Sequence, residues 1–218
     1  PEYAEKCHHL AYEIVNLPGN VTMSSREGTV VLLEDLVREA TQRAFQIVAE
    51  KNPELSEAAK KEIAFAVAMG SIKYSMLSKD NTKVVTFDWE RAMDFNGQAA
   101  PYIQYAYVRA GSILRKAGGT VGTIEHPASD LHPTEVQLID VMTRIPDVIQ
   151  RAAEEYRPLH VATLAYDLAR AFNDFYNQCP VLKEDGEIRA FRLHIVAAAR
   201  QALGNCLAVL GIVAPDAM

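Results

Sequence analysis

Two groups of residues carry side chains suited to binding phosphate or nucleic acid. The first is the loop Met23 to Gly28, in which Ser24, Ser25 and Arg26 stand between two strand-like runs. Serine hydroxyls and backbone amides bind phosphate oxygens, and an arginine neutralises their charge. The loop is not a Walker A motif, because the pattern G-x-x-x-x-G-K-[ST] is absent. A serine-rich surface turn is the alternative interpretation.

The second group is a stripe of tyrosines and cations along one predicted helix. At 100° per residue its members share a side of the helix that is distinct from the apolar side. The stripe comprises Tyr102, Tyr105, Arg109, Ser112 and Lys116. Residues 97–124 contain no acidic residue, although the whole chain has a net charge of −6. Cations that neutralise phosphates and rings that stack on unpaired bases suit RNA. The alternative is that the tyrosines pack against another helix and the cations are solvated.

Neighbouring polar residues are given lesser roles. Gln104 lies off the stripe, and we expect it to make a structural hydrogen bond. On the last predicted helix, Arg189, Arg192 and Arg200 lie within about a quarter turn of one another. Arg189 and Arg192 are secondary candidates for contact with a phosphate backbone, and a solvated face is the alternative for them.

Histidines and cysteines do not predict a metal site. The adjacent residues Cys7, His8 and His9 cannot easily point at one ion, so we predict no metal. His132 is interpreted as a solvated loop residue, and Cys206, like Cys179, as a small core residue. Three cysteines without a C-x-x-C motif indicate reduced thiols and a cytoplasmic protein.

The elements that must position these residues are mostly helices. Helical periodicity and capping residues predict helices over 34–51, 56–78, 101–117, 158–178, a helix that begins at Pro133 with a break or kink at Pro146, and a last helix with Ile188 to Val209 on its apolar face. Gly70 on the apolar face of the second helix predicts a close approach by another helix.

Short strands are predicted over 12–15, 29–32 and 83–89, and Asp88 is predicted to cap a helical turn after the last of them. The fold class is therefore mainly α, with a small α/β piece followed by a helical bundle. We expect one unit over 1–80, a junction over 81–97 and the bundle over 98–218.

Four stretches carry a family resemblance. Residues 23–31 read M-S-S-R-E-G-T-V-V, 87–89 read F-D-W, 101–109 read P-Y-I-Q-Y-A-Y-V-R, and 210–218 read L-G-I-V-A-P-D-A-M. The first resembles the K-M-S-K-S signature of class I aminoacyl-tRNA synthetases in its arginyl form. The next two resemble the start of the DALR-type anticodon-binding bundle of arginyl-tRNA synthetases, and the last resembles that family's C-terminus. The whole chain thus resembles the C-terminal part of an arginyl-tRNA synthetase.

The resemblance implies a parent ligase that joins arginine to tRNA(Arg) through an arginyl-adenylate, using ATP and Mg²⁺. Ser24, Ser25 and Arg26 would lie over the ATP phosphates. The residues that would contact tRNA are Tyr102, Tyr105, Arg109, Lys116 and the chain-terminal Met218. Thr22 stands where the signature has its first lysine, so part of the charge stabilisation would come from Arg26 or from elsewhere in the parent enzyme.

The H-I-G-H signature and the Rossmann core of the family are absent from this sequence. We therefore expect the chain not to aminoacylate tRNA by itself. We expect a monomer that needs no cofactor, and that has tRNA(Arg) and the missing N-terminal part as partners. No apolar run approaches the roughly 20 residues of a membrane helix, so no membrane partner is expected. The alternative is a free-standing helical protein-interaction module without an RNA role. The acid-free segment 97–124 argues against it, because the centre of a protein interface is more often apolar.

Overall fold

The computed structural model describes residues 3–17, 21–22, 31–119, 130–184 and 186–218. Helices dominate these residues, as the sequence predicts. In chain order the elements are η1 (Ala4–Lys6), β1 (Val15–Leu17), β2 (Val21–Thr22), α1 (Leu33–Lys51), α2 (Glu57–Leu77), β3 (Val85–Thr86), α3 (Trp89–Ala92), α4 (Ala100–Lys116), α5 (Pro133–Thr143), α6 (Ile145–Glu154), α7 (Leu159–Gln178) and α8 (Gly186–Val209).

Local signals set most of the helix ends. The Ser56 hydroxyl accepts a hydrogen bond from the Ala59 amide at 3.3 Å and caps α2. Asp88 likewise caps α3, and Pro146 stands in the first turn of α6, so the predicted break at this proline is confirmed. After α4 the chain turns at Gly118, whose φ of 98° is a conformation that glycine adopts without strain.

One cap was not predicted. His132 is the N-cap of α5, where its Nδ1 accepts a hydrogen bond from the Thr134 amide at 3.3 Å. In return the Glu135 carboxylate accepts a hydrogen bond from the His132 amide at 2.7 Å, which completes a capping box. His132 is exposed, as its interpretation as a solvated residue predicts, and it also has a capping role that was not predicted.

The strands are shorter than predicted and partly displaced. β1 pairs antiparallel with β2 and parallel with β3, so the sheet order is β2-β1-β3. Of the predicted strand over 12–15, only Val15 lies in a strand. The prediction over 29–32 is wrong for its described part, because Val31 and Leu32 lead directly into α1; residues 29–30 lie outside the described residues. Within 83–89, a strand forms at Val85–Thr86.

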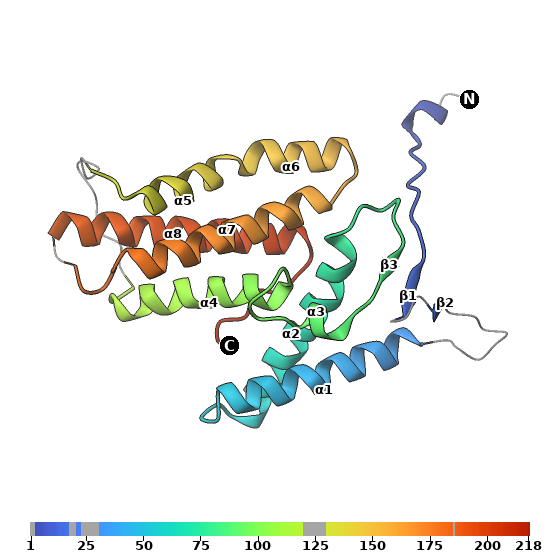
Figure 1. The fold of residues 1–218 in the computed structure, drawn as a ribbon, viewed down its shortest axis with the longest axis horizontal. Coiled ribbons are helices and arrows are strands. Elements are labelled where there is room, and N and C mark those ends of the chain that lie inside the picture. Colours follow the sequence, from blue (N-terminus) through green and yellow to red (C-terminus); the bar gives the residue numbers. More distant parts are fainter. Residues whose placement is uncertain (1–2, 18–20, 23–30, 120–129, 185) are drawn as a thin grey trace.

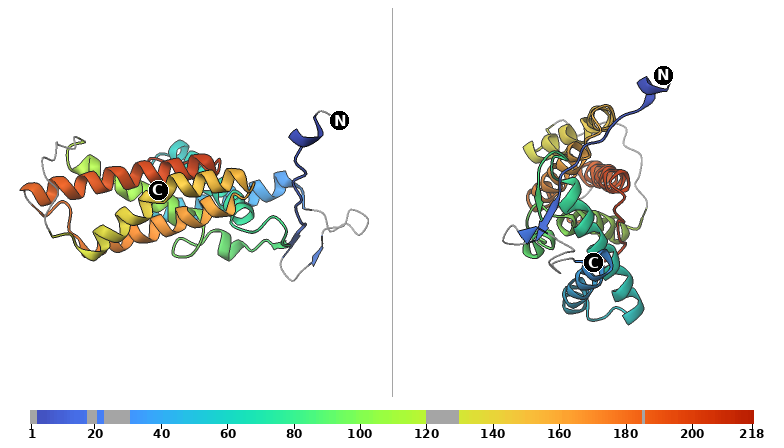
Figure 2. Two further views of the ribbon diagram at one scale, coloured as in Figure 1. Left: turned by 90° about the horizontal axis from the view of Figure 1, so that it is seen from above. Right: turned by 90° about the vertical axis from the view of Figure 1, so that its right-hand side faces the viewer.

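Two hydrophobic clusters hold the described elements together. The larger lies among α4, α5, α7 and α8, with Phe172 and Leu203 among its fully buried side chains. The smaller lies among α1, α2 and α3. Figure 1 shows α4, α7 and α8 running side by side, with the α1–α2 pair below them. Figure 2 shows that the bundle helices follow the long axis of the molecule, with the N-terminal segment at one end.

The predicted apolar face of α8 is buried only in its middle. Ile195, Ala199, Ala202 and Cys206 are buried, as expected. Ile188 and Val209 are exposed, so the two ends of this predicted face extend beyond the cluster.

The crossing of α2 and α4 is closed by the C-terminal tail. Gly70 faces Gln104, and a Cβ at Gly70 would lie 2.9 Å from the Gln104 Nε2 atom and 3.1 Å from Ile212 Cγ2. Gln104 is fully buried, and its Nε2 donates hydrogen bonds to the Ala66 carbonyl at 3.2 Å and the Val213 carbonyl at 2.8 Å. Both the close approach at Gly70 and the structural role of Gln104 are confirmed.

Candidate nucleic-acid interface

The predicted stripe on α4 is completed by residues of α7. The Arg109 guanidinium lies over the Tyr105 ring at 4.5 Å and over the Tyr176 ring at 4.8 Å from the ring centroids. Its Nη1 donates a hydrogen bond to the Asn173 side-chain oxygen at 2.7 Å. No carboxylate of the described residues forms an ion pair with Arg109. Two rings and a neutral amide therefore fix this cation without neutralising it.

Helix geometry explains why these groups meet. Tyr105 and Arg109 are four residues apart on α4, and Asn173 and Tyr176 are three apart on α7, so each pair shares a helix face. The two rings remain accessible, with Tyr105 36% and Tyr176 41% exposed. The sequence places Asn173 only as a helix cap or surface residue and assigns no role to Tyr176, because their proximity to Arg109 depends on the packing of α7 against α4.

A hollow of about 460 Å³ continues from Arg109 toward the end of α4. Ser112 and Lys116 line it from α4, and Tyr176 and Lys183 line it from α7 and the segment that follows. Arg109, Ser112 and Lys116 thus border one hollow, and Tyr105 adjoins it through its contact with Arg109. We call the group Tyr105, Arg109, Ser112, Lys116 and Tyr176 the tyrosine–arginine face.

Two predicted contact residues lie apart from this face. Tyr102 is half-buried, and its ring packs on Tyr166 with centroids 5.5 Å apart, against the larger hydrophobic cluster. Met218 packs against the smaller cluster. The contacts of Arg109 are with Tyr105, Tyr176 and Asn173. The contact of Tyr102 and Met218 with RNA therefore stays a prediction.

Arg192, a secondary candidate for phosphate contact, is bound by carboxylate and carbonyl groups within the protein. Its side chain is 13% exposed, and its Nε donates to the Glu135 carboxylate at 2.7 Å. Its Nη1 donates to the Pro180 carbonyl at 2.7 Å and the Glu184 carboxylate at 3.2 Å. Burial acts to lower the pKa of Arg192, but the hydrogen bond and charge of Glu135 raise it overall. Arg192 therefore fixes α8 to α5.

The predicted phosphate loop lies outside the described residues. Ser24, Ser25 and Arg26 are therefore not placed by the structure. β2, which contains Thr22, ends where this loop begins.

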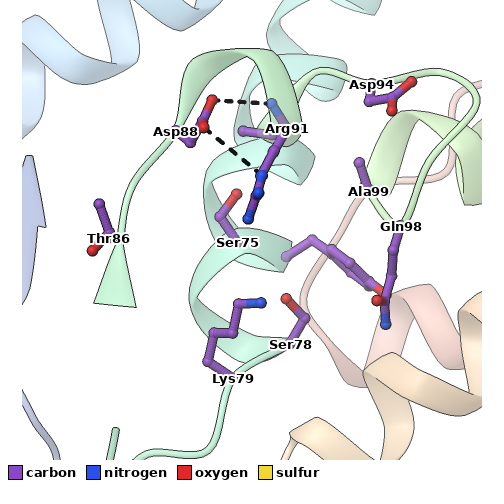
Figure 3. A pocket seen from close by; sticks show the side chains of 11 residues that line it. Ser75, Ser78, Lys79, Thr86, Asp88, Arg91, Asp94, Gln98 and Ala99 are labelled. Atoms are coloured by element: carbon purple, nitrogen blue, oxygen red, sulfur yellow. Dashed lines mark hydrogen bonds and ion pairs between the residues drawn. The ribbon is translucent and has the colours of Figure 1, made fainter. Parts of the chain in front are cut away.

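A second hollow, of about 270 Å³, lies where α2, β3 and α3 meet. Figure 3 shows Ser75 of α2, with Ser78 and Lys79 just after its end, on one side and the Asp88–Arg91 pair on the other. Tyr74 also lines the hollow, and its hydroxyl donates to the Ala162 carbonyl at 3.1 Å, while burial raises its pKa. No local sequence pattern predicts this hollow, because it forms only where distant segments pack together.

The described residues contain no group of three His, Cys, Asp or Glu side chains that could hold a metal ion. In this same part of the chain, no helix is long and apolar enough to cross a membrane. Cys179 and Cys206 are buried, which confirms their interpretation as core residues, and burial raises the pKa of Cys206 to about 11.

Residues 103–218, just over half of the chain, match the family described as DALR anticodon binding domain. Residues 1–89 match the family described as tRNA synthetases class I (R), catalytic domain. The chain belongs to the arginyl-tRNA synthetase family. The resemblance identified in the sequence is thereby confirmed.

Individual arginyl-tRNA synthetases match almost the whole chain. An arginine–tRNA ligase of Pyrococcus abyssi is 42% identical over 99% of this chain, which spans 35% of that relative's length. The corresponding ligase of Chloroflexus aurantiacus is 38% identical over 96% of this chain, which spans 37% of its length. The solved structure of Thermus thermophilus arginyl-tRNA synthetase is 38% identical and superposes with a TM-score of 0.88, covering 99% of this chain and 36% of that one. The mainly helical fold class is therefore also confirmed.

Proposed function

We propose that this chain binds tRNA(Arg) through the tyrosine–arginine face, as part of an ATP-dependent arginine–tRNA ligase. One observation carries the proposal: the Arg109 guanidinium is held between Tyr105 and Tyr176 and has no ion-pair partner among the described residues. The alternative role, a free-standing protein-interaction module, would not need such a cation.

The physical chemistry of the face suits an unpaired RNA loop. Tyr105 and Tyr176 offer partly exposed rings on which bases can stack, each stack contributing about 1–3 kcal/mol. Because Asn173 holds the guanidinium at 2.7 Å, Arg109 meets a phosphate or a base edge with little further loss of side-chain entropy. Lys116, at the far end of the hollow, would neutralise a second phosphate.

Tyr102 and Met218 have different proposed roles. Tyr102 stands one turn before Tyr105 on α4 and rests on Tyr166, so RNA would meet the part of it that remains accessible. Met218 would meet RNA from the side of the smaller cluster, against which it packs. These two contacts rest on the family resemblance rather than on a shared surface with Arg109.

The catalytic part of the proposal rests on the sequence motif. Ser24, Ser25 and Arg26 would hold the phosphates of ATP, together with Mg²⁺, by charge and hydrogen bonding. When bound, ATP supplies the adenylyl group that activates arginine. We also propose that the ligase is a cytoplasmic monomer. Its structural units would be 1–80, 81–97 and 98–218, the last being the anticodon-binding bundle.

Binding of this chain to a tRNA(Arg) transcript, over a series of salt concentrations, tests the proposal. A transcript with altered anticodon-loop bases is the comparison RNA. We expect tighter binding to the natural transcript, and a loss of about 1–3 kcal/mol for Tyr176→Ala. Tyr176→Phe is the matched control and should retain most of the affinity, because it keeps the ring. Equal affinity of the Tyr176→Ala and wild-type chains, both folded, would remove this face from the binding site.

A further inference from the structure

A pair of arginines converges on another side of α4, away from Arg109. Arg115 of α4 and Arg200 of α8 both lie over Gly111: a Cβ at this glycine would be 3.0 Å from Arg200 Nε and 3.3 Å from an Arg115 terminal nitrogen. Two positive charges that flank one glycine repel each other, so an anion bound between them would be favourable. Gly111 gives the two guanidinium groups the room to meet.

One arginine of the pair is held in place by an aromatic ring. The Arg200 guanidinium lies over Tyr107 at 4.7 Å from the ring centroid. A Cβ at Gly204 would lie 3.1 Å from that ring, so Gly204 lets Tyr107 seat between α4 and α8. The Arg200 Nε is buried and has no hydrogen-bond partner among the described residues. Arg200 is therefore oriented, yet one of its donors is unused.

Among the described residues, Asp216 alone forms an ion pair with this arginine pair, through Arg200, and the contact is weak. Asp216 lies 3.6 Å from an Arg200 terminal nitrogen, and its side chain is 89% exposed. Within the described part of the chain, Arg115 donates a hydrogen bond only to the Asp216 backbone carbonyl, at 3.4 Å. Such an exposed, long contact contributes little free energy and is easily displaced.

The charged residues of α4 and α8 give the surface around Arg115 and Arg200 a positive charge. α4 contains three cations and no acidic residue, and the only acidic residue of α8 is Glu187, near its first turn. Arg109 and Arg115 are six residues apart, so they point about 120° apart around α4. The arginine pair is therefore separate from the tyrosine–arginine face but can reach the same polyanion.

We propose that Arg115 and Arg200 form a phosphate-binding site that takes a phosphodiester of the tRNA backbone. The proposal rests on the proposed function, because it assumes that the chain binds tRNA. A phosphodiester oxygen can accept from the terminal nitrogens of both guanidinium groups, and it replaces the weak contacts with Asp216. This contact carries no base information, so it serves affinity and orientation rather than anticodon choice.

The salt dependence of RNA binding tests this site. We expect the double variant Arg115→Gln/Arg200→Gln to reduce the slope of log K against log salt by about 1, which corresponds to about tenfold weaker binding at 0.1 M salt. The reduction should be equal for the natural transcript and the transcript with altered anticodon-loop bases. The control Arg38→Gln/Arg144→Gln removes the same charge from two exposed arginines and should leave the slope unchanged.

A variant that is expected to tighten RNA binding excludes a merely structural explanation. Asp216→Asn removes the internal competitor and should tighten RNA binding, whereas general damage to the fold would weaken it. Arg115→Gln alone, at an exposed position, should keep the wild-type melting temperature and still lower the slope. An unchanged slope in the double variant, or weaker binding by Asp216→Asn, would overturn the proposal.

Titration with inorganic phosphate separates the two sources of the anion. NMR of the arginine Nε–H groups should show saturable shifts at Arg200 that Arg115→Gln weakens. Phosphate binding with an unchanged RNA slope would mean a site for the free ion, and would also overturn the assignment to RNA. If the wild-type chain binds both transcripts equally well and the double variant still reduces the slope, the proposed function of the tyrosine–arginine face is contradicted but this site stands.

Discussion

Arg109 on α4 and Arg192 on α8 are predicted from the sequence as possible contacts with nucleic acid, yet their surroundings differ. Arg192 is enclosed by the carboxylates of Glu135 and Glu184 and by the Pro180 carbonyl. Arg109 is enclosed by two tyrosine rings and the Asn173 amide oxygen. Both side chains are fixed, but only Arg109 keeps a charge that no neighbouring acid balances.

A fixed side-chain position alone therefore does not distinguish an arginine that binds a ligand from one that stabilises the fold. A carboxylate partner neutralises the arginine charge and so weakens its attraction for a phosphate. Aromatic and amide partners restrict the side chain without cancelling its field. The chemistry of the partners therefore decides which arginine of this bundle meets an external anion.

Arg192→Ala should give the largest effect, and the effect is on stability. The change leaves the Glu135 carboxylate, which is almost fully buried, without its cation. Breaking a buried pair from one side costs about 3–5 kcal/mol in the free energy of unfolding. Urea denaturation followed by circular dichroism measures this loss. A loss below about 1 kcal/mol would mean that water or another cation replaces Arg192.

A double variant distinguishes the buried charge from the lost packing. Glu135→Gln/Arg192→Met removes both charges and keeps an amide that can serve the capping box with His132. We expect it to recover most of the stability that Arg192→Ala loses, since apolar replacements of buried pairs are often neutral. Failure to recover would assign the effect to packing of the arginine side chain.

Arg109→Ala should give an intermediate effect, and the effect is on binding. We expect tRNA affinity to fall by about 1–3 kcal/mol. The free energy of unfolding should change by less than about 1 kcal/mol, because no buried charge loses its partner. Filter binding and urea denaturation of the same sample measure the two quantities. A variant that loses stability but keeps affinity would reverse the comparison with Arg192.

Arg151→Gln should give the smallest effect on stability, because the carboxylate partner of Arg151 is exposed to solvent. Glu155 accepts hydrogen bonds from Arg151 at 2.8 Å and His160 at 2.7 Å, and these two lower its pKa. The stabilising contribution of Glu155 is therefore present above its unfolded pKa of about 4.3 and is lost as the pH falls through its lowered folded value.

An NMR pH titration of the Glu155 carboxyl carbon measures this contact. Arg151→Gln should raise the pKa of Glu155 toward its ordinary value, while stability at pH 7 changes less than in any other variant here. An unchanged pKa would mean that His160 alone perturbs Glu155.

The helices were predictable because their signals are local. Ser56, Asp88 and the two prolines Pro133 and Pro146 each act within a few residues of the helix end that they set. The strands were less predictable because each has only two or three residues and depends on a distant partner. Val15 pairs with Val85, and no periodicity within residues 12–15 contains that information.

The candidate site divides in the same way. The stripe on α4 follows from helical periodicity, so Arg109 and Tyr105 could be named from the sequence. Tyr176 could not, since it joins the stripe through the packing of α7 against α4. The ion pair between Arg192 and Glu135, which lies 57 residues earlier in the chain, is equally non-local.

The hydrogen bond between Gln104 and Val213 has a consequence for folding during synthesis. Its two partners are 109 residues apart, a stretch that a ribosome adds in roughly 5–20 s. Until residues 211–213 emerge, the Gln104 amide has only the Ala66 carbonyl to bind, and the face of Gly70 that Ile212 covers stays open. The nascent chain therefore exposes the α2–α4 crossing for seconds. A chaperone that shields apolar surface would have its longest opportunity there.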